Sequence, residues 1–270
     1  GAPRIGYDPV TLAVKGLLME GARTTQCTES EYRNGLTDAS IRGGLISSVA
    51  FSGLFSNTGI AFGHDGVTVS YAYKPITLTA GVSTLSVFVR MTDGLAPSFG
   101  SASVTSPLNS FALIFETTTP SPLNYVTENY GGGLYRVSIT ITTTAVAGSH
   151  NGVLKYPTND SRTFTASGLQ IELGGAASSY IPTTTATVTR AADVWTVAST
   201  AFNLNQSAGT LYASATTKTT GIFHGLACVS DGTPAERAQV YLTSLAANWL
   251  VADGSVLQNS VTTLLTATLR

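Results

Sequence analysis

The chain has 270 residues, enough for one large or two modest domains with a hydrophobic core. Charged residues make up only 11% of it, against about 25% in an ordinary globular domain, and the formal net charge is -1. Lys and Arg are scattered, so no nucleic-acid partner is predicted. No apolar run approaches the roughly 20 residues of a membrane helix, so no membrane insertion is predicted.

Residues 1–38 are predicted to form an N-terminal arm or linker. Within it, Gly16–Gly21 (GLLMEG) is a short apolar patch between glycines, which we expect to be a strand or turn anchored on a neighbouring element. The two cysteines, Cys27 and Cys228, lie far apart and at no motif spacing. This pattern favours two buried thiols over a disulfide.

Residues 39–193 contain no long stretch with a 3.6-residue period, but strand patterns recur with turn residues between them. Many short strands at this spacing predict an antiparallel sandwich or jelly roll. The clearest predicted strands are Val67–Lys74, Leu85–Met91, Ser110–Phe115, Leu134–Thr143 and Arg162–Glu172.

Alternation within these strands predicts one buried and one wet face. Tyr135, Val137 and Ile139 share one face of their strand, and Arg136 and Ser138 share the other. In the same way, Val67, Val69, Tyr71 and Tyr73 are predicted to share a buried face. Turns are predicted at Gly131–Gly133 and at five Asp-Gly or Asn-Gly pairs. These pairs are Asp65-Gly66, Asp93-Gly94, Asn151-Gly152, Asp231-Gly232 and Asp253-Gly254.

A second unit is predicted from about Trp195 onward. Pro234 with good helix formers behind it allows a short helix. Against this, Gln239 and Tyr241 alternate with apolar neighbours, and Asp253-Gly254 is a hairpin signal, so strands are favoured.

The sequence carries no motif for catalysis, a cofactor or a metal. His64, His150 and His224 lie in turn-like contexts without a partner at metal-ligand spacing. No nucleophile elbow, phosphate-binding loop or Cys-x-x-Cys pair is present. We therefore predict no catalytic residue, no metal site and no cofactor, and a protein that is not an enzyme.

A polysaccharide-cleaving enzyme would need two positioned carboxylates. Glu172 is interpreted as structural, and Asp65 and Asp231 are explained by the turns that they open. The full set of candidates on or near strands is Glu116, Glu128, Glu172, Asp65, Asp160 and Asp231.

Sugar binding is the function class that the sequence leaves open. Pyranose rings pack their C–H faces on aromatic rings, while short polar side chains bind the hydroxyls. Tyr125 and Tyr130 lie in a stretch that reads as a loop, LNYVTENYGGG, beside Glu128 and Asn129. These four residues, with Trp249 further on, are the predicted glycan-binding residues.

Two long segments of unusual composition carry a family resemblance. Arg4–Thr25 reads RIGYDPVTLAVKGLLMEGARTT, and Leu169–Val194 reads LQIELGGAASSYIPTTTATVTRAADV. Together they resemble bacteriophage virion proteins of the tail-fibre and head-spike kind. Arg23 and Arg190 fall inside these segments, and pairing with Glu20, Asp8 or Asp193 is expected to lock the segments together.

The resemblance implies a carbohydrate-binding jelly roll over 39–193 and a partial concanavalin-like or laminin-G-like β domain over 194–270. It also implies a location on the virion, at tail or head. The implied partners are copies of the same chain in a homotrimer, other virion proteins of tail or capsid, and host cell-surface polysaccharide. A trimer is expected to bury the apolar arm and the segment Ile181-Pro182.

Two other functions remain open. One is a ligand-free structural adaptor or decoration protein of the virion, which buried Tyr125 and Tyr130 would favour. The other is a capsular polysaccharide depolymerase, which two carboxyl groups about 5–10 Å apart in a groove would favour.

Overall fold

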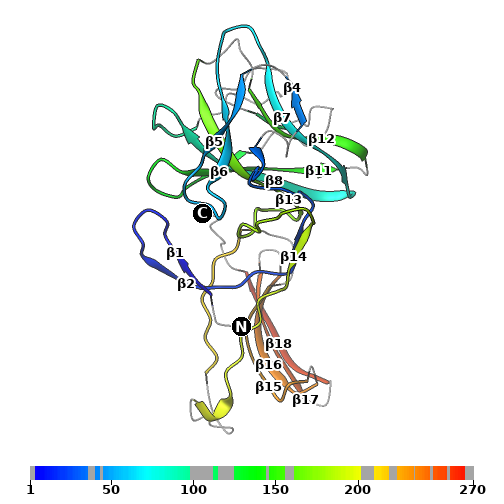
Figure 1. Ribbon diagram of the computed structural model, residues 1–270. Coiled ribbons are helices and arrows are strands. Elements are labelled where there is room, and N and C mark those ends of the chain that lie inside the picture. Colours follow the sequence, from blue (N-terminus) through cyan, green and yellow to red (C-terminus); the bar gives the residue numbers. More distant parts are fainter. Residues whose placement is uncertain are drawn as a thin grey trace. The chain divides into compact units, whose positions relative to one another are not determined.

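The chain is all-β with antiparallel strands, as the sequence predicts. It divides into two units, Gly1–Trp195 and Thr196–Arg270, whose strands run from blue through green to yellow and from orange to red in Figure 1. The predicted division into 1–38, 39–193 and 194–270 stays a prediction. The computed structural model describes residues 4–35, 40–42, 45–97, 112–114, 125–143, 146–155, 161–201, 210–218, 224–233, 235–243, 246–253 and 256–264.

An eight-stranded antiparallel sheet forms the larger layer of the first unit. Its main path runs β10-β11-β8-β13-β3-β14, and β6 joins it by pairing with β13 and carries β5. Its strands are β3 (Arg23–Thr25), β5 (Ile46–Ala50), β6 (Thr58–Phe62), β8 (Gly81–Met91), β10 (Tyr125–Asn129), β11 (Tyr135–Thr143), β13 (Phe164–Leu173) and β14 (Val188–Arg190).

A four-stranded sheet forms the second layer, in the order β4-β7-β12-β9. The core lies between the two layers, since Ala72 and Val153 of the smaller sheet are buried with Val87, Ile139 and Ile171 of the larger one. Alternating apolar residues on facing strands produce this core, so the sandwich follows from the sequence pattern. The smaller sheet consists of β4 (Ser40–Arg42), β7 (Ser70–Leu78), β9 (Ala112–Ile114) and β12 (Val146–Lys155).

The first residues form a hairpin of β1 (Arg4–Tyr7) and β2 (Val14–Leu18). The patch predicted as a strand or turn lies on β2 and the residues that follow it. Beyond the hairpin, β3 joins the large sheet, and Cys27 and Tyr32 are fully buried in the sandwich core. Burial of Cys27 was predicted, whereas Cys228 is exposed, so that half of the prediction is wrong; both thiols are free.

A charged network connects the base of the hairpin to the end of the sandwich. The Arg4 guanidinium donates to both carboxylate oxygens of Asp193 and lies 3.0 Å from Glu20. Glu20 in turn accepts hydrogen bonds of 2.7 Å from Arg190 and from the Ser179 N–H. The expected pairing of Arg190 with Glu20 is therefore confirmed.

The pKa values of both carboxyls in this network are lowered. Burial alone would raise the pKa of Glu20, but the hydrogen bonds from Ser179 and the two guanidinium groups outweigh it and hold it below its ordinary value. The pKa of Asp193 is lowered mainly by its hydrogen bond from Arg4.

The second unit contains one four-stranded antiparallel sheet, in the order β15-β16-β17-β18. Strand β16 covers the residues behind Pro234, so the strand alternative is correct there. The unit begins with a short 3-10 helix, η2 (Ser199–Ala201), and no helix in the described part of the chain could cross a membrane. The strands are β15 (His224–Ser230), β16 (Arg237–Thr243), β17 (Ala246–Asp253) and β18 (Val256–Leu264).

Two sequence predictions about the first unit are wrong in detail. Val67 lies in the Asp65 turn, 82% exposed, because β7 starts only at Ser70. Asn151 and Gly152 lie within β12 and form no turn. A side chain at Gly152 would meet the Ala72 carbonyl at 2.0 Å, so this glycine allows two strands to approach closely.

Candidate functional site

The face of the large sheet that points away from the smaller sheet is covered by the segment 177–183. Buried Glu172 on β13 holds this segment, accepting hydrogen bonds of 2.7 Å from both the N–H and the hydroxyl of Ser178. Gln170 accepts from the Ile181 N–H at 2.7 Å and donates to Glu172 at 2.9 Å. Ile181 is therefore buried within its own chain and offers no apolar surface to a trimer.

Arg136 is buried on this covered face, although alternation predicts a wet position. Its guanidinium donates to the Ser178 carbonyl and, at 2.9 Å, to the Ser86 hydroxyl. The same group lies over the Phe88 ring, 5.3 Å from its centroid. The covering segment thus supplies the partner that lets a charged side chain be buried there.

An aromatic cluster lies beside Arg136. Phe88 is the buried central ring, and Tyr130 and Tyr180 pack on it edge to face, with centroids 5.3 and 5.6 Å away. Tyr180 shares a 2.6 Å hydrogen bond with Ser30, and burial raises the pKa of its hydroxyl. Tyr130 is 36% exposed, so it presents an oriented ring to solvent.

Two loops border the aromatic cluster and are tied together by Arg90. Its guanidinium donates to the Gly132 carbonyl of the loop after Tyr130, and to the Ser52 carbonyl of the loop after β5 at 3.3 Å. The second loop carries Phe55, which is 74% exposed.

Buried Glu31 fixes the conformation of the loop that carries Phe55. Its carboxylate accepts from the Phe55 N–H at 3.3 Å and from the Ser56 N–H and hydroxyl, the latter at 2.5 Å. The exposed aromatic side chains of both loops therefore stand on a rigid base, which lowers the entropy cost of binding a ligand there.

The predicted glycan residues are divided between the two faces of one strand. The sequence predicts a loop at residues 125–129, and this is wrong. These residues form strand β10 at the edge of the large sheet. Tyr125 packs against the sandwich core, whereas Glu128 pairs with Arg136 in the register and so lies on the covered face with Tyr130. Asn129 is exposed, and its side-chain oxygen accepts from the Gly131 N–H at 2.8 Å.

Trp249 lies in the second unit, where the backbone register pairs it with Val240 and Val261; its side chain is outside the described part. Sequence reasoning missed Phe88, Phe55 and Arg90. Only the Phe-Ser-Gly-Leu-Phe-Ser-Asn stretch at 51–57, an apolar turn-rich sequence, could have pointed to the second loop.

Three of the candidate carboxylates, Asp65, Glu172 and Asp231, have structural roles. Asp65 and Asp231 accept hydrogen bonds from the turns that they open, as predicted, and these bonds lower the pKa of both carboxyls, to about 2 for Asp65. Glu172 is buried and holds the covering segment through its hydrogen bonds from Ser178. Glu116 and Asp160 lie outside the described residues. No group of three potential metal ligands is found in the described ranges.

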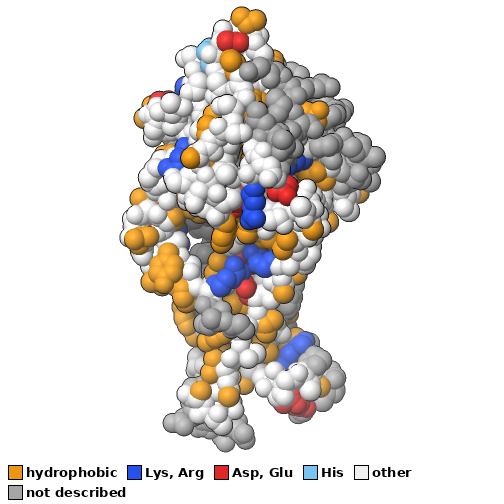
Figure 2. Space-filling model, viewed as in Figure 1, with side chains coloured by type: hydrophobic (Ala, Val, Ile, Leu, Met, Phe, Trp, Pro, Cys, Tyr) orange, Lys and Arg blue, Asp and Glu red, His pale blue; other side chains and the backbone are white. Residues whose placement is uncertain are grey.

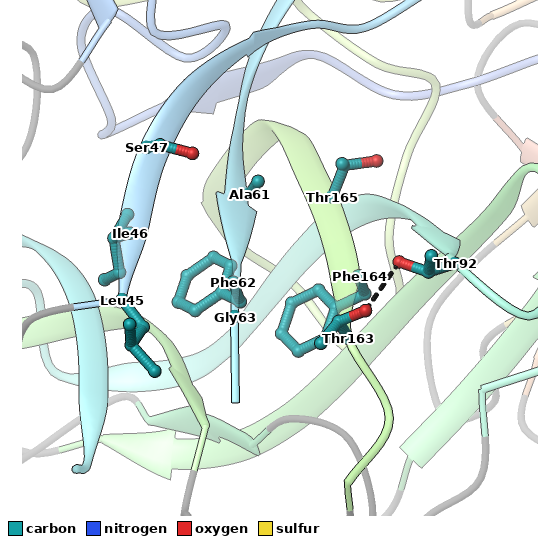
Figure 3. Close-up of a pocket in the computed structure, with 10 residues that line it drawn as sticks. All are labelled: Leu45, Ile46, Ser47, Ala61, Phe62, Gly63, Thr92, Thr163, Phe164 and Thr165. Atoms are coloured by element: carbon teal, nitrogen blue, oxygen red, sulfur yellow. Dashed lines mark hydrogen bonds between the residues drawn. The ribbon is translucent and has the colours of Figure 1, made fainter. Parts of the chain in front are cut away.

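A pocket of about 420 Å³ lies at the end of the large sheet, away from the aromatic cluster. Figure 3 shows Phe62 and Phe164 side by side in this pocket, and their stacked rings have centroids 4.7 Å apart. The Thr163 hydroxyl donates a hydrogen bond to the Thr92 hydroxyl. Both rings are buried, so the pocket presents mainly small side chains such as Ser47. Charged side chains are few and scattered on the face of the molecule in Figure 2.

No protein-family model and no curated protein matches the sequence. Among solved structures, the chain is similar to the CBM22-1 xylan-binding domain of Xyn10C from Paenibacillus barcinonensis, with 14% identity over 57% of this chain and 94% of that chain, at a TM-score of 0.34. TmCBM61 in complex with β-1,4-galactotriose matches with 10% identity over 54% and 97% of the two chains, at 0.31. The CBM22-1-CBM22-2 tandem of Xyn10C matches with 14% identity over 82% and 63%, at 0.36. Likenesses this weak carry no argument about function.

Proposed function

We propose that the first unit binds carbohydrate at the aromatic cluster around Tyr130. The observation that supports it best is the Tyr130 ring, which is partly exposed and held edge-on against buried Phe88. A pyranose C–H face stacks on such a ring, and Glu128, which lies on the same face of β10, carries a carboxylate that hydrogen-bonds hydroxyls.

The ligand in this proposal is a neutral or weakly charged glycan. The chain carries few charges, and the Arg90 and Arg136 guanidinium groups are already engaged with backbone carbonyls. Binding through stacking and hydrogen bonds would change little with ionic strength, unlike binding through exposed ion pairs.

We further propose that the protein is a structural component of a phage tail fibre or head spike and contributes to attachment to host-surface glycan. This part rests on the resemblance of Arg4–Thr25 and Leu169–Val194 alone. Several weak sites on one particle would provide attachment by avidity. A non-catalytic role agrees with the structural roles of Asp65, Glu172 and Asp231.

A glycan array that includes bacterial surface polysaccharides tests the proposal. The wild type is expected to bind a defined subset of glycans, and Tyr130→Ala is expected to lose that signal. Tyr212→Ala is the matched control, because Tyr212 is also an exposed tyrosine but lies in the second unit. Absence of wild-type binding across the array, or equal loss in both variants, would reject a carbohydrate site at Tyr130.

A further inference from the structure

One face of strand β10 carries a row of three accessible side chains, Val126, Glu128 and Tyr130. They alternate along the chain, so they point to the same side of the large sheet. The strand pairing continues past Asn129, since the Tyr130 N–H donates to the Leu134 carbonyl at 2.8 Å. Val126 is 55% exposed and Glu128 is half-buried. We call this row of three side chains the β10 ledge.

The covering segment and Gly175 before it run beside the β10 ledge and form a wall along it. The Gly175 carbonyl accepts from the Thr140 hydroxyl at 3.5 Å, and the Ser178 carbonyl accepts from the Arg136 guanidinium. Thr140 and Arg136 lie on β11, the strand directly next to β10. In the described part of the chain, β10 is the edge strand of the sheet. The ledge is therefore one strand wide, about 5 Å, with a wall along its inner side.

The N-terminal hairpin closes one end of the β10 ledge. The Pro9 carbonyl at the tip of the hairpin lies 3.2 Å from the position that a Cβ atom would take at Gly131, directly after Tyr130. The charged network at the base of the hairpin holds it in this place. A ligand stacked on Tyr130 therefore has room to extend along the ledge towards Val126, and the hairpin limits its extension in the other direction.

We propose that the carbohydrate site at Tyr130, on which this inference rests, extends over the whole β10 ledge and binds an elongated glycan. The chain of sugar units runs along β10. From Val126 to Tyr130 the ledge spans four residue steps of about 3.4 Å, about 14 Å in all. One pyranose unit covers little more than one tyrosine ring, so contacts with all three side chains require several linked units.

The three side chains of the ledge make different contacts with such a glycan. The Tyr130 ring stacks on one pyranose face, and the Val126 side chain packs against the C–H groups of a unit further along the chain. Between them, the Glu128 carboxylate accepts hydrogen bonds from sugar hydroxyls. Glu128 is the one charged member of the ledge, and its charge disfavours an anionic chain. The ligand class that fits is therefore a neutral oligosaccharide or polysaccharide.

Isothermal titration of the full chain tests the proposal with a polysaccharide that the glycan array selects and with a series of its fragments of increasing length. The affinity of the wild type should rise with fragment length over several sugar units. Val126→Asp replaces an apolar contact with a charge that bound glycan would desolvate, so it should weaken binding of the longest fragments at least about tenfold. Thr127→Asp is the matched control, because Thr127 is exposed on the opposite face of β10, paired with Val137 of the core. It should bind every fragment as the wild type does.

The results distinguish the ledge from a site at Tyr130 alone. If Tyr130→Ala weakens binding while Val126→Asp binds as Thr127→Asp does, the glycan does not run along β10, and the site at Tyr130 still stands. A monosaccharide bound as tightly as the longest fragment would also overturn the elongated ligand. Absence of wild-type binding across the array would reject the carbohydrate site itself, and the ledge with it. Should Val126→Asp lower the Tm, Val126→Ala takes its place, with an expected loss of affinity of about threefold.

Discussion

The replacement Glu172→Ala should release the segment that covers the large sheet. Glu172 is fully buried and accepts three hydrogen bonds, two from Ser178 and one from Gln170. Alanine removes all three acceptor contacts and leaves the Ser178 N–H buried beside a cavity. The segment from Ala177 to Thr183 would then lose its main attachment to β13.

The expected cost follows from these contacts. A buried donor left without a partner costs about 1–3 kcal/mol. Three donors lose their acceptor, and the Ser178 hydroxyl keeps the Ser179 carbonyl at 3.3 Å as a partner. The replacement also removes the desolvation cost of burying the Glu172 carboxylate, which offsets part of this. We therefore expect the free energy of unfolding to fall by about 3 kcal/mol. For a unit of this size each kcal/mol lowers the Tm by about 2–4 °C, so the Tm should fall by about 10 °C.

Scanning calorimetry of the full chain measures this change. Glu172→Gln keeps the shape and one accepting oxygen, so it should cost about 1 kcal/mol. Leu173→Ala is the matched control, because the next residue along β13 is 40% exposed and should cost less than about 1 kcal/mol. If Glu172→Ala were as mild as Leu173→Ala, Glu172 would not be holding the covering segment.

Three further results are expected. Because the folded-state pKa of Asp193 is lowered, its contribution to stability is present above its unfolded pKa and lost as pH falls through the folded value. Asp193→Asn should therefore lower the Tm by more at pH 7 than at pH 2.5, as thermal melts at the two pH values would show. Ellman titration of the native protein should count one thiol per chain, Cys228, because burial raises the pKa of Cys27 to about 12. Gly168→Ala should cost about 2–4 kcal/mol in urea unfolding, because φ is +67° there and the new methyl group would meet two side chains at 2.9 Å.

Each of these results has a contrary outcome. An equal effect of Asp193→Asn at both pH values would mean that its carboxylate charge does not stabilise the fold. Two reactive thiols in the native protein would contradict the burial of Cys27. A Gly168→Ala variant as stable as the wild type would show that the backbone at this position is not constrained.

The sandwich itself could be predicted from the sequence. Alternation in strands such as Leu134–Thr143 depends only on the two-residue period of a strand, which is a local property. The apolar residues Val137 and Ile139 accordingly lie in the core. Turn residues were equally reliable where the turn is local, as at Asp65-Gly66, and failed at Asn151-Gly152, where the glycine serves contact with another strand.

The covered face and the candidate site could not be predicted in the same way. Alternation predicts that Arg136 is exposed to solvent. It is buried instead, because its hydrogen-bond partners lie 42 and 50 residues away along the chain, where a local pattern does not show them. The grouping of Tyr125 with Tyr130 failed for a related reason. A stretch read as a loop has no defined faces, but in an edge strand Tyr125 turns into the core while Tyr130 stays at the surface.

Carbohydrate binding at Tyr130 is tested by the affinity of this site for the polysaccharide that the array selects. Isothermal titration of the wild type and Tyr130→Ala against that polysaccharide gives the two dissociation constants. Loss of an aromatic stacking contact worth about 1.4 kcal/mol should weaken binding about tenfold. We expect this loss with an unchanged Tm, and equal affinities of the two proteins would contradict a carbohydrate site at Tyr130.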